Sequence, residues 1–350
     1  MTERRVFLLI AAALAVIAGA LWLSSQRHLP HSIDAGAKLF PALRTDDLRE
    51  IDLIKAGGKR AVTLVVENNQ WTVAERDHYP ADAARVRGLV LGIADLAVVE
   101  EKTSDPKNYP AIGVEDIAST NAGGTQVELK GASGSASLIV GRSSGAKSSF
   151  VRKPGRAESL LATPQVYVDA QPQNWLHRPI VDVPSDRVQQ VRVTIGKLSY
   201  TLARKDRGQA NLALLSAPKG KTLVTESAGD VVATALGGLE LDDVRKVNAA
   251  EWQAPAEHAE FRTFDGWVID VDGRKDGDKN WIRVSSQYDE ALAKSFPAPS
   301  TDPKAPPAPQ VDSRKAAEAL AALASGWAFE VPKYKYDTLF KPLDDIVKKP

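Results

Sequence analysis

The sequence predicts an α+β fold, with an N-terminal transmembrane helix followed by two homologous halves of antiparallel sheet with packed helices. Three observations support this prediction: an unbroken apolar run near the N-terminus, short alternating apolar and polar segments, and an order of elements that occurs twice. The expected parts are a cytoplasmic tip and anchor at 1–27, a stalk at 28–47, a first repeat at 48–183, and a second repeat at 184–350 with a Pro-rich insertion at 296–310.

The composition excludes several classes of protein. The 350 residues are 43% hydrophobic and 25% charged, a globular mixture long enough for more than one domain. Lys and Arg number 45 against 44 Asp and Glu, so no global positive field favours nucleic acid as a partner. There is no cysteine, and the only methionine is Met1, which excludes thiol nucleophiles, disulfides and zinc–cysteine sites. We expect no cofactor and no bound metal.

The first feature along the chain is an apolar run at residues 6–23, preceded by Arg4 and Arg5. At about 1.5 Å per residue, a helix of this length reaches roughly 27 Å, close to the hydrocarbon thickness of a bilayer. The two arginines predict a cytoplasmic N-terminus and a periplasmic bulk at a bacterial inner membrane. Ala18-Gly19-Ala20 also fits a signal-peptide cleavage pattern, so cleavage remains the alternative.

Within this run, two sets of side chains have different expected partners. Small residues allow close approach of another transmembrane helix. The residues expected to offer that contact are Ala12, Ala15 and Gly19. The residues expected to anchor the helix in lipid are Val6, Phe7, Leu8, Leu9, Ile10, Leu14, Val16, Ile17, Leu21, Trp22 and Leu23.

The first repeat begins with a hairpin around Gly57-Gly58, between strands near 48–53 and 62–66, followed by a strand at 71–73. Asp82 is placed to cap a helix whose apolar residues recur at helical spacing from Val86 to Ala97. We interpret Glu100-Glu101-Lys102 as the solvated exit of that helix. Four further strands are expected at Val127–Leu129, Leu138–Val140, Phe150–Val151 and Val166–Val168.

The second repeat follows the same order. Val188, Val191 and Val193 fall where Leu48, Ile51 and Leu53 fell, and the apolar residues from Val232 to Leu239 match the first helix. The insertion at 296–310 is too rich in proline for a helix or an inner strand. A helix is then expected over Ser313–Ser325, with Gly326 ending it.

Two short motifs resemble functional sites, and we interpret both as hairpin turns. Gly141-Arg142-Ser143-Ser144-Gly145 satisfies the G-x-S-x-G pattern of a hydrolase, but the nucleophile elbow needs a following helix, and a strand is expected here. The aspartates at 270, 272, 276 and 278 invite a calcium site but lack the glutamate at its twelfth position.

Aromatic residues provide the candidates for ligand contact. The tryptophans lie beside predicted strand ends, where burial in the core is the commoner role and a stacking surface is the alternative. The six of interest are Trp71, Trp175, Trp252, Trp267, Trp281 and Trp327. The candidate binding surface comprises Trp71, Tyr79 and Trp175.

Several segments together carry a family resemblance. They are the N-terminal apolar run, Trp71-Thr72-Val73, Tyr79-Pro80-Ala81-Asp82, Leu89 and Leu96, Glu101-Lys102-Thr103 with Tyr109, Asn174 to Pro179, and Tyr336-Asp337 with Leu339. With these segments the chain resembles the bacterial membrane proteins grouped as domain of unknown function 4340. The resemblance implies association with an ABC-type transport system of the gliding-motility auxiliary kind, and it implies no catalytic residues.

Three hypotheses of function follow. The leading one is a membrane-anchored, non-enzymatic accessory subunit whose partners are the ABC permease and ATPase subunits, a related auxiliary membrane protein and the lipid bilayer. The alternative is a free-standing envelope protein that binds polysaccharide, peptidoglycan or lipid through a surface cluster of Trp175, Trp267 or Trp281. The third is a periplasmic serine hydrolase that uses Ser143 with His177.

Overall fold

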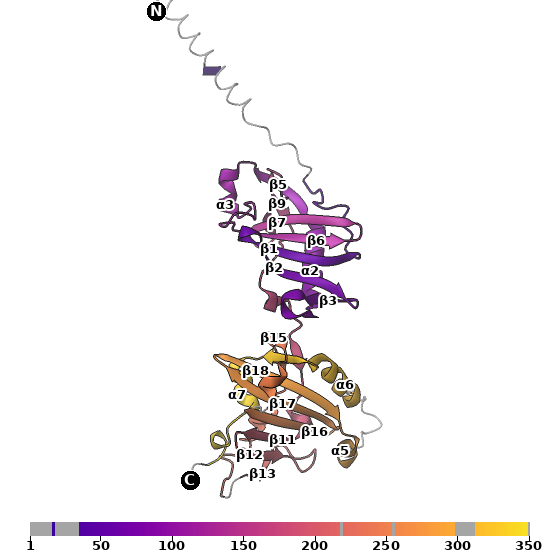
Figure 1. Cartoon of the computed structure of the whole chain (residues 1–350), viewed down its shortest axis with the longest axis vertical. Coiled ribbons are helices and arrows are strands. Elements are labelled where there is room, and N and C mark those ends of the chain that lie inside the picture. Colours follow the sequence, from indigo (N-terminus) through magenta and orange to yellow (C-terminus); the bar gives the residue numbers. More distant parts are fainter. Residues whose placement is uncertain (1–15, 18–34, 218–219, 254–255, 298–311, 349–350) are drawn as a thin grey trace, which may run out of the picture. The chain divides into compact units, whose positions relative to one another are not determined.

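The structure is a computed structural model that describes residues 16–17, 35–217, 220–253, 256–297 and 312–348 (Figure 1). The chain divides into two compact units. The first comprises the chain up to Ala61 together with Arg87–Ala170, and the second comprises Val62–Val86 together with the chain from Gln171 onward. The strands pair antiparallel and a few helices accompany them, which confirms the predicted α+β class with antiparallel sheets.

The first sheet has nine strands in the order β4-β3-β2-β1-β6-β7-β8-β9-β5. Its strands are β1 (Leu48–Lys55), β2 (Lys59–Glu67), β3 (Gln70–Val73), β4 (Tyr79–Pro80), β5 (Ala97–Thr103), β6 (Thr125–Gly131), β7 (Gly134–Ser144), β8 (Ser148–Arg152) and β9 (Ser159–Thr163). Its helices are α2 (Ala83–Asp95) and α3 (Tyr109–Ile112), with 3-10 turns at Ala56–Gly58, Ala74–Arg76 and Pro106–Asn108.

The second sheet has eight strands in the order β13-β12-β11-β16-β17-β18-β19-β15, and β10 pairs separately with β14. The strands are β10 (Pro179–Val181), β11 (Val188–Ile195), β12 (Leu198–Ala203), β13 (Ala213–Ser216), β14 (Leu239–Glu240), β15 (Asp243–Lys246), β16 (Glu257–Thr263), β17 (Trp267–Asp276), β18 (Lys279–Tyr288) and β19 (Trp327–Glu330). The helices are α4 (Asp230–Ala233), α5 (Glu290–Ser295), α6 (Ser313–Ala324) and α7 (Lys333–Leu339), with 3-10 turns at Pro172–Trp175, Ser185–Arg187, Ala249–Trp252 and Leu343–Asp345.

The two sheets share one strand order. Reading β3-β2-β1-β6-β7-β8-β9-β5 against β13-β12-β11-β16-β17-β18-β19-β15, each of these eight strands of the first sheet has a counterpart in the second. Two differences stand out. Strand β4 has no counterpart at the edge of the second sheet, and β18 is joined to β19 through α5 and α6 where β8 and β9 are joined by residues 153–158.

Buried apolar side chains line the central strands of each sheet. In β1, Ile51 and Leu53 are fully buried, and in β11, Val191 and Val193 are fully buried. Helix α2 begins after Asp82, whose carboxylate accepts the N–H groups of residues 84 and 85 at 2.9 and 3.0 Å, as the sequence predicts. Helix α6 packs across β17 and β18.

Three sequence predictions of secondary structure are wrong. The first helix ends at Asp95, and Glu100-Glu101-Lys102 lies in β5, which pairs with β9. Val166–Val168 is not a strand; β9 takes that place and ends just before Pro164, which has no N–H to donate. The second helix is only the short α4, because the chain turns at Gly237 and Gly238, and Gly238 has φ 52°.

The predicted membrane helix lies almost wholly outside the described residues. Only Val16 and Ile17 of that run are described, and they are helical. The other lipid-anchoring residues, the contact residues Ala12, Ala15 and Gly19, the stalk up to residue 34, and residues 298–311 of the insertion lie outside the description. No helix in the described part of the chain is both long and apolar enough to cross a bilayer.

Two buried arginines fasten loops to the sheets. Arg152, 2% exposed, donates to the carbonyl oxygens of Val114 and Arg156, each at 2.7 Å. Arg204 donates to the carbonyl oxygens of residues 185, 188 and 210 at 2.7, 2.7 and 2.9 Å. Because a guanidinium presents several donors in a fixed plane, each side chain satisfies several loop carbonyls at once.

Asp265 joins three segments of the second unit. Its Oδ2 atom accepts hydrogen bonds from Arg187 Nη2 and Ser313 Oγ, each at 2.5 Å. Burial alone would raise the pKa of the Asp265 carboxyl, but hydrogen bonds from Ser313, Thr263 and Arg187 outweigh burial and hold that pKa below its ordinary value. The ionised carboxylate therefore ties the start of α6 to the beginning of β11.

We expect Asp265→Asn to destabilise the protein by about 2 kcal/mol at pH 7, because it removes a charged acceptor from two hydrogen bonds. A depressed folded-state pKa contributes stability above the ordinary Asp pKa of about 3.9, and that stability is lost as the pH falls through the folded-state value. Urea unfolding at pH 7, 5, 4 and 3 should therefore show a shallower loss of stability in the variant than in the wild type. The exposed Asp278→Asn serves as the control, and parallel pH profiles for Asp265→Asn and wild type would contradict the assignment.

Candidate binding site

The predicted aromatic surface is mostly core. Tyr79 is 0% exposed and Trp175 is 1% exposed, whereas Trp71 is partly exposed in β3. The Tyr79 ring packs edge-on against Trp327 and Phe329, with centroids 5.0 and 6.2 Å away. The prediction that Tyr79 and Trp175 form an exposed binding surface is therefore wrong, because both rings are enclosed by apolar neighbours.

The structure does bring the segments around Tyr79 and Trp175 together. Ala81 and Leu176 form an antiparallel bridge, and the N–H of Asp82 donates to the carbonyl of Trp175 at 2.7 Å. These bonds fix the start of α2 to the 3-10 turn at Pro172–Trp175. The aromatic residues that the sequence singled out thus have a packing role.

The alternative tryptophan cluster is also buried. Trp175, Trp267 and Trp281 are 1%, 5% and 5% exposed, so they offer no exposed stacking platform. The Trp267 Nε1 atom donates to Ser286 Oγ at 2.7 Å inside the second sheet. The expectation that the tryptophans belong to the core is confirmed for Trp175, Trp252, Trp267, Trp281 and Trp327.

Ser143 lies in a hairpin, as the sequence predicts. It is near the end of β7, and Gly145 at φ 64° turns the chain directly into β8. No helix follows to form a nucleophile elbow. The Ser143 hydroxyl accepts a hydrogen bond from Gln165 Nε2 at 2.6 Å, and His177 belongs to the other compact unit.

The aspartates of the second sheet also lie in the expected hairpin. Asp276 pairs with Lys279 across the turn from β17 to β18. Asp272 accepts hydrogen bonds from His258 Nδ1 at 2.9 Å and from Arg283 Nη2 at 2.6 Å. Among the described residues, no group of three or more His, Cys, Asp or Glu side chains is arranged to hold a metal.

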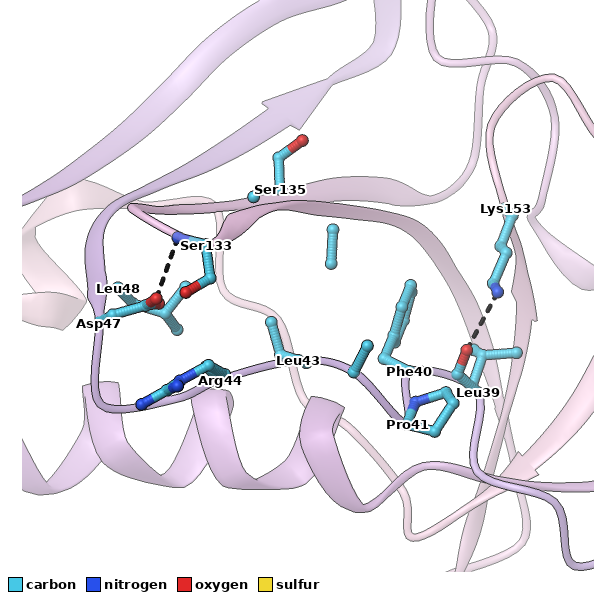
Figure 2. A pocket seen from close by; sticks show the side chains of 13 residues that line it. Leu39, Phe40, Pro41, Leu43, Arg44, Asp47, Leu48, Ser133, Ser135 and Lys153 are labelled. Carbon is cyan, nitrogen blue, oxygen red and sulfur yellow. Dashed lines mark hydrogen bonds between the residues drawn. The ribbon is translucent and has the colours of Figure 1, made fainter.

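A pocket of about 280 Å³ lies where the chain joins the first unit (Figure 2). We call it the N-terminal pocket. One wall is the segment Leu39–Leu48, and the others are Ser133 in the β6–β7 turn with the start of β7 at 134–136, and Lys153. The lining residues are Leu39, Phe40, Pro41, Ala42, Leu43, Arg44, Asp47, Leu48, Ser133, Gly134, Ser135, Ala136 and Lys153.

Polar contacts hold the pocket walls in place. Lys153 Nζ donates to the carbonyl of Leu39 at 3.0 Å and lies 4.8 Å from the centroid of the Phe40 ring. Asp47 accepts the N–H of Ser133 at 3.0 Å, and Figure 2 shows both contacts at opposite ends of the pocket. A side chain at Gly131 would come within 2.5 Å of Asp47 Oδ1, so this position favours glycine.

The pocket combines an apolar floor with charges of both signs. Leu39 and Leu48 are buried, Leu43 is partly buried, and Arg44 is exposed at the rim. This combination suits a short protein segment better than a metal ion or a phosphate group. The sequence predicts only a stalk over residues 28–47, so no pocket was expected there. The apolar stretch Leu39-Phe40-Pro41-Ala42-Leu43 was the available signal.

Comparison with known proteins gives one match. The family model described as a domain of unknown function, DUF4340, matches residues 71–258, more than half of the chain. The chain belongs to this family. The match confirms the resemblance found in the sequence, and the DUF4340 region runs from β3 through the start of β16. Searches of curated proteins and of solved structures found no significant match.

In this DUF4340 protein, substitutions of Tyr79 can measure separately what its aromatic ring and its hydroxyl contribute to the free energy of unfolding. Burial raises the pKa of the Tyr79 hydroxyl, and its oxygen has no hydrogen-bond partner among the described residues. We expect Tyr79→Ala to lower the unfolding free energy by about 3 to 5 kcal/mol, since the whole ring is lost from the core.

Tyr79→Phe is the matched control for this prediction. It retains the ring contacts with Trp327 and Phe329 and removes only an unpaired buried hydroxyl, so the unfolding free energy should stay the same or rise. Denaturant titration of both variants measures the difference. A loss above about 2 kcal/mol in Tyr79→Phe would mean that the hydroxyl has a partner in solution.

Proposed function

We propose that this protein is a single-pass, membrane-anchored accessory subunit of an ABC-type transport complex, which binds partner subunits or the transported molecule without catalysis. Its N-terminus would lie in the cytoplasm and its bulk in the periplasm at the bacterial inner membrane. The observation that carries the proposal is the apolar run at 6–23, which stands immediately before a globular region built of antiparallel sheets.

The N-terminal pocket supports a role near the membrane. Fifteen residues lie between Leu23 and Leu39, and a fully extended chain across that interval reaches at most about 55 Å. A pocket lined by Leu39–Leu48 therefore stays close enough to contact a partner that emerges from the same membrane. Its apolar floor and its charges of both signs suit a segment of such a partner.

The nature of the partners rests on the family. The resemblance stated above implies a permease, an ATPase and a related auxiliary membrane protein. The chain belongs to the DUF4340 family, whose description names no function, so the partners rest on the resemblance alone.

The proposal also includes the two-repeat organisation, with homologous halves at 48–183 and 184–350. Support comes from the shared strand order of the two sheets. The compact units do not follow these limits, because Val62–Val86 groups with the second unit. We therefore regard the repeats as related in topology, with the segment 62–86 belonging to the first repeat in sequence and to the second compact unit by its contacts.

Anchoring can be tested by placing charges in the apolar run. Leu9→Arg with Leu14→Arg should shift the protein from the membrane pellet to the soluble fraction after alkaline carbonate extraction. Each arginine near the centre of a spanning helix costs about 2.5 to 3.5 kcal/mol of insertion free energy. Leu9→Ile with Leu14→Ile is the matched control and should remain in the pellet. Retention of the arginine variant in the pellet would contradict a spanning helix.

Partner binding can be tested at the N-terminal pocket. We expect affinity purification of the full chain from detergent-solubilised membranes to recover permease and ATPase subunits, and Leu43→Arg to reduce that recovery because it places an unpaired charge on the pocket floor. Tyr167→Arg, on an exposed residue of the same unit, should leave recovery unchanged. The proposal fails if the wild-type chain recovers neither subunit.

A further inference from the structure

The four outer strands of the two large sheets differ in how their free edges are protected. A strand at a sheet edge presents unpaired N–H and C=O groups, and native proteins usually cover or charge such edges. Strand β4 carries Pro80, which has no N–H to offer. Strand β5 is covered by the incoming chain, because the N–H of Gly36 donates to the carbonyl of Val98 and the N–H of Val98 donates to the carbonyl of Ala37.

The remaining two edges belong to the second sheet. On β15, Asp243 is held by the guanidinium of Arg76, with Nε to Oδ1 at 2.5 Å and Nη2 to Oδ2 at 3.0 Å. Strand β13 has no such protection: Ala213-Leu214-Leu215-Ser216 contains neither a charge nor a proline. Its Leu215 side chain is 66% exposed. Among the described edges, β13 is therefore the one suited to pairing with another strand.

The first sheet shows what can pair with an edge strand such as β13. Strand β3 has the same place in its sheet as β13, and the chain beyond β3 returns as β4 and pairs with it through Thr72 with Pro80 and Val73 with Tyr79. In the second sheet the chain beyond β13 returns at Leu223 but pairs with Val347 instead. Among the residues that the structure describes, no strand occupies the position beside β13 that corresponds to β4.

A groove lies along this open edge. Its volume is about 660 Å³, which is within the range of ligand and peptide pockets. One side is formed by residues 209–214, which lead into β13, and the other by residues 221–226. Hydrogen bonds from the N–H of Val224 to Ile346 O at 3.0 Å and from the N–H of Lys348 to Thr222 O at 2.8 Å fix the second side to the C-terminal segment.

We propose that β13 accepts an extended segment of a partner protein as an additional antiparallel strand, with one large apolar or aromatic side chain of that segment entering the groove. Main-chain hydrogen bonds to the edge would supply affinity, and the groove would select the side chain. The segment expected to fit resembles β4, in which Tyr79 provides the buried ring and the pairing residues carry no charge. This interaction does not depend on membrane anchoring or on the N-terminal pocket.

The test uses a synthetic fluorescein-labelled peptide with the chain's own residues 75–82 (ERDHYPAD) and the purified full chain in detergent. Fluorescence anisotropy should show saturable binding to the wild type. Ala213→Lys with Leu215→Lys should weaken binding about tenfold or more, because lysine on an edge strand opposes pairing. Both replaced side chains are exposed, so the fold should be retained, and circular dichroism checks this. Leu198→Lys, at the start of β12, is the matched control and should bind as the wild type does.

The absence of cysteine permits a second readout. Leu215→Cys would be the only thiol in the protein. It should attack the same peptide carrying an N-terminal cysteine activated as its thionitrobenzoate disulfide, forming the mixed disulfide and releasing thionitrobenzoate faster than Leu198→Cys does. Equal rates for the two variants would overturn the assignment to β13.

Other outcomes would also overturn the proposal. Equal binding to the lysine variant would place the peptide elsewhere, for example on β3 in exchange for β4. Equal binding of a scrambled peptide, or no saturable binding, would exclude recognition of such a segment. Self-association of the wild type that is lost in the lysine variant without peptide would make a second copy of this chain the occupant.

Discussion

Antiparallel pairing between strands that are distant in sequence is the constraint on which the rest of the structure depends. In the first unit β1 pairs with β6, placing Ile51 opposite Leu129 and Leu53 opposite Val127. In the second unit β11 pairs with β16, placing Val191 opposite Phe261. Each pairing joins an N-terminal hairpin to a later meander and closes a long loop at an entropic cost. The helices, the buried arginines and the pockets all sit on sheets that exist only once these central pairs have formed.

In both units, charged side chains attach neighbouring segments to the sheets through hydrogen bonds. Arg152 in β8 and Arg204 just after β12 donate to backbone carbonyl groups, most of them in loops. Asp265 attaches α6 in a similar way, because it accepts hydrogen bonds from both Arg187 and Ser313. These three side chains therefore position neighbouring segments of the protein. Their burial is explained by these hydrogen bonds and needs no catalytic role.

Local patterns in the sequence predicted much of this fold. Period-two alternation located β1, β2, β6 and β7, and the cap at Asp82 located the start of α2. The prediction failed where tertiary pairing overrides local pattern: Glu100-Glu101-Lys102, expected as the solvated exit of the helix, lies in a strand because β9 is available beside it. The prediction of a binding surface at Tyr79 and Trp175 was wrong for a related reason. Tyr79 meets Trp327 and Phe329 only through the fold, and no local feature marks a ring as enclosed.

The enclosure of Tyr79 has a consequence for the order of events during synthesis. A chain made from its N-terminus exposes the segment Val62–Val86 early, but this segment belongs to the unit that is completed by the C-terminal part of the chain. The ring of Tyr79 cannot be buried before Trp327 and Phe329 have been synthesised, almost 250 residues later. Over that interval an aromatic side chain and an incomplete sheet edge are open to solvent and to wrong partners. Chains that terminate before β19 would carry this unburied ring permanently, which makes them natural substrates for chaperones and proteases.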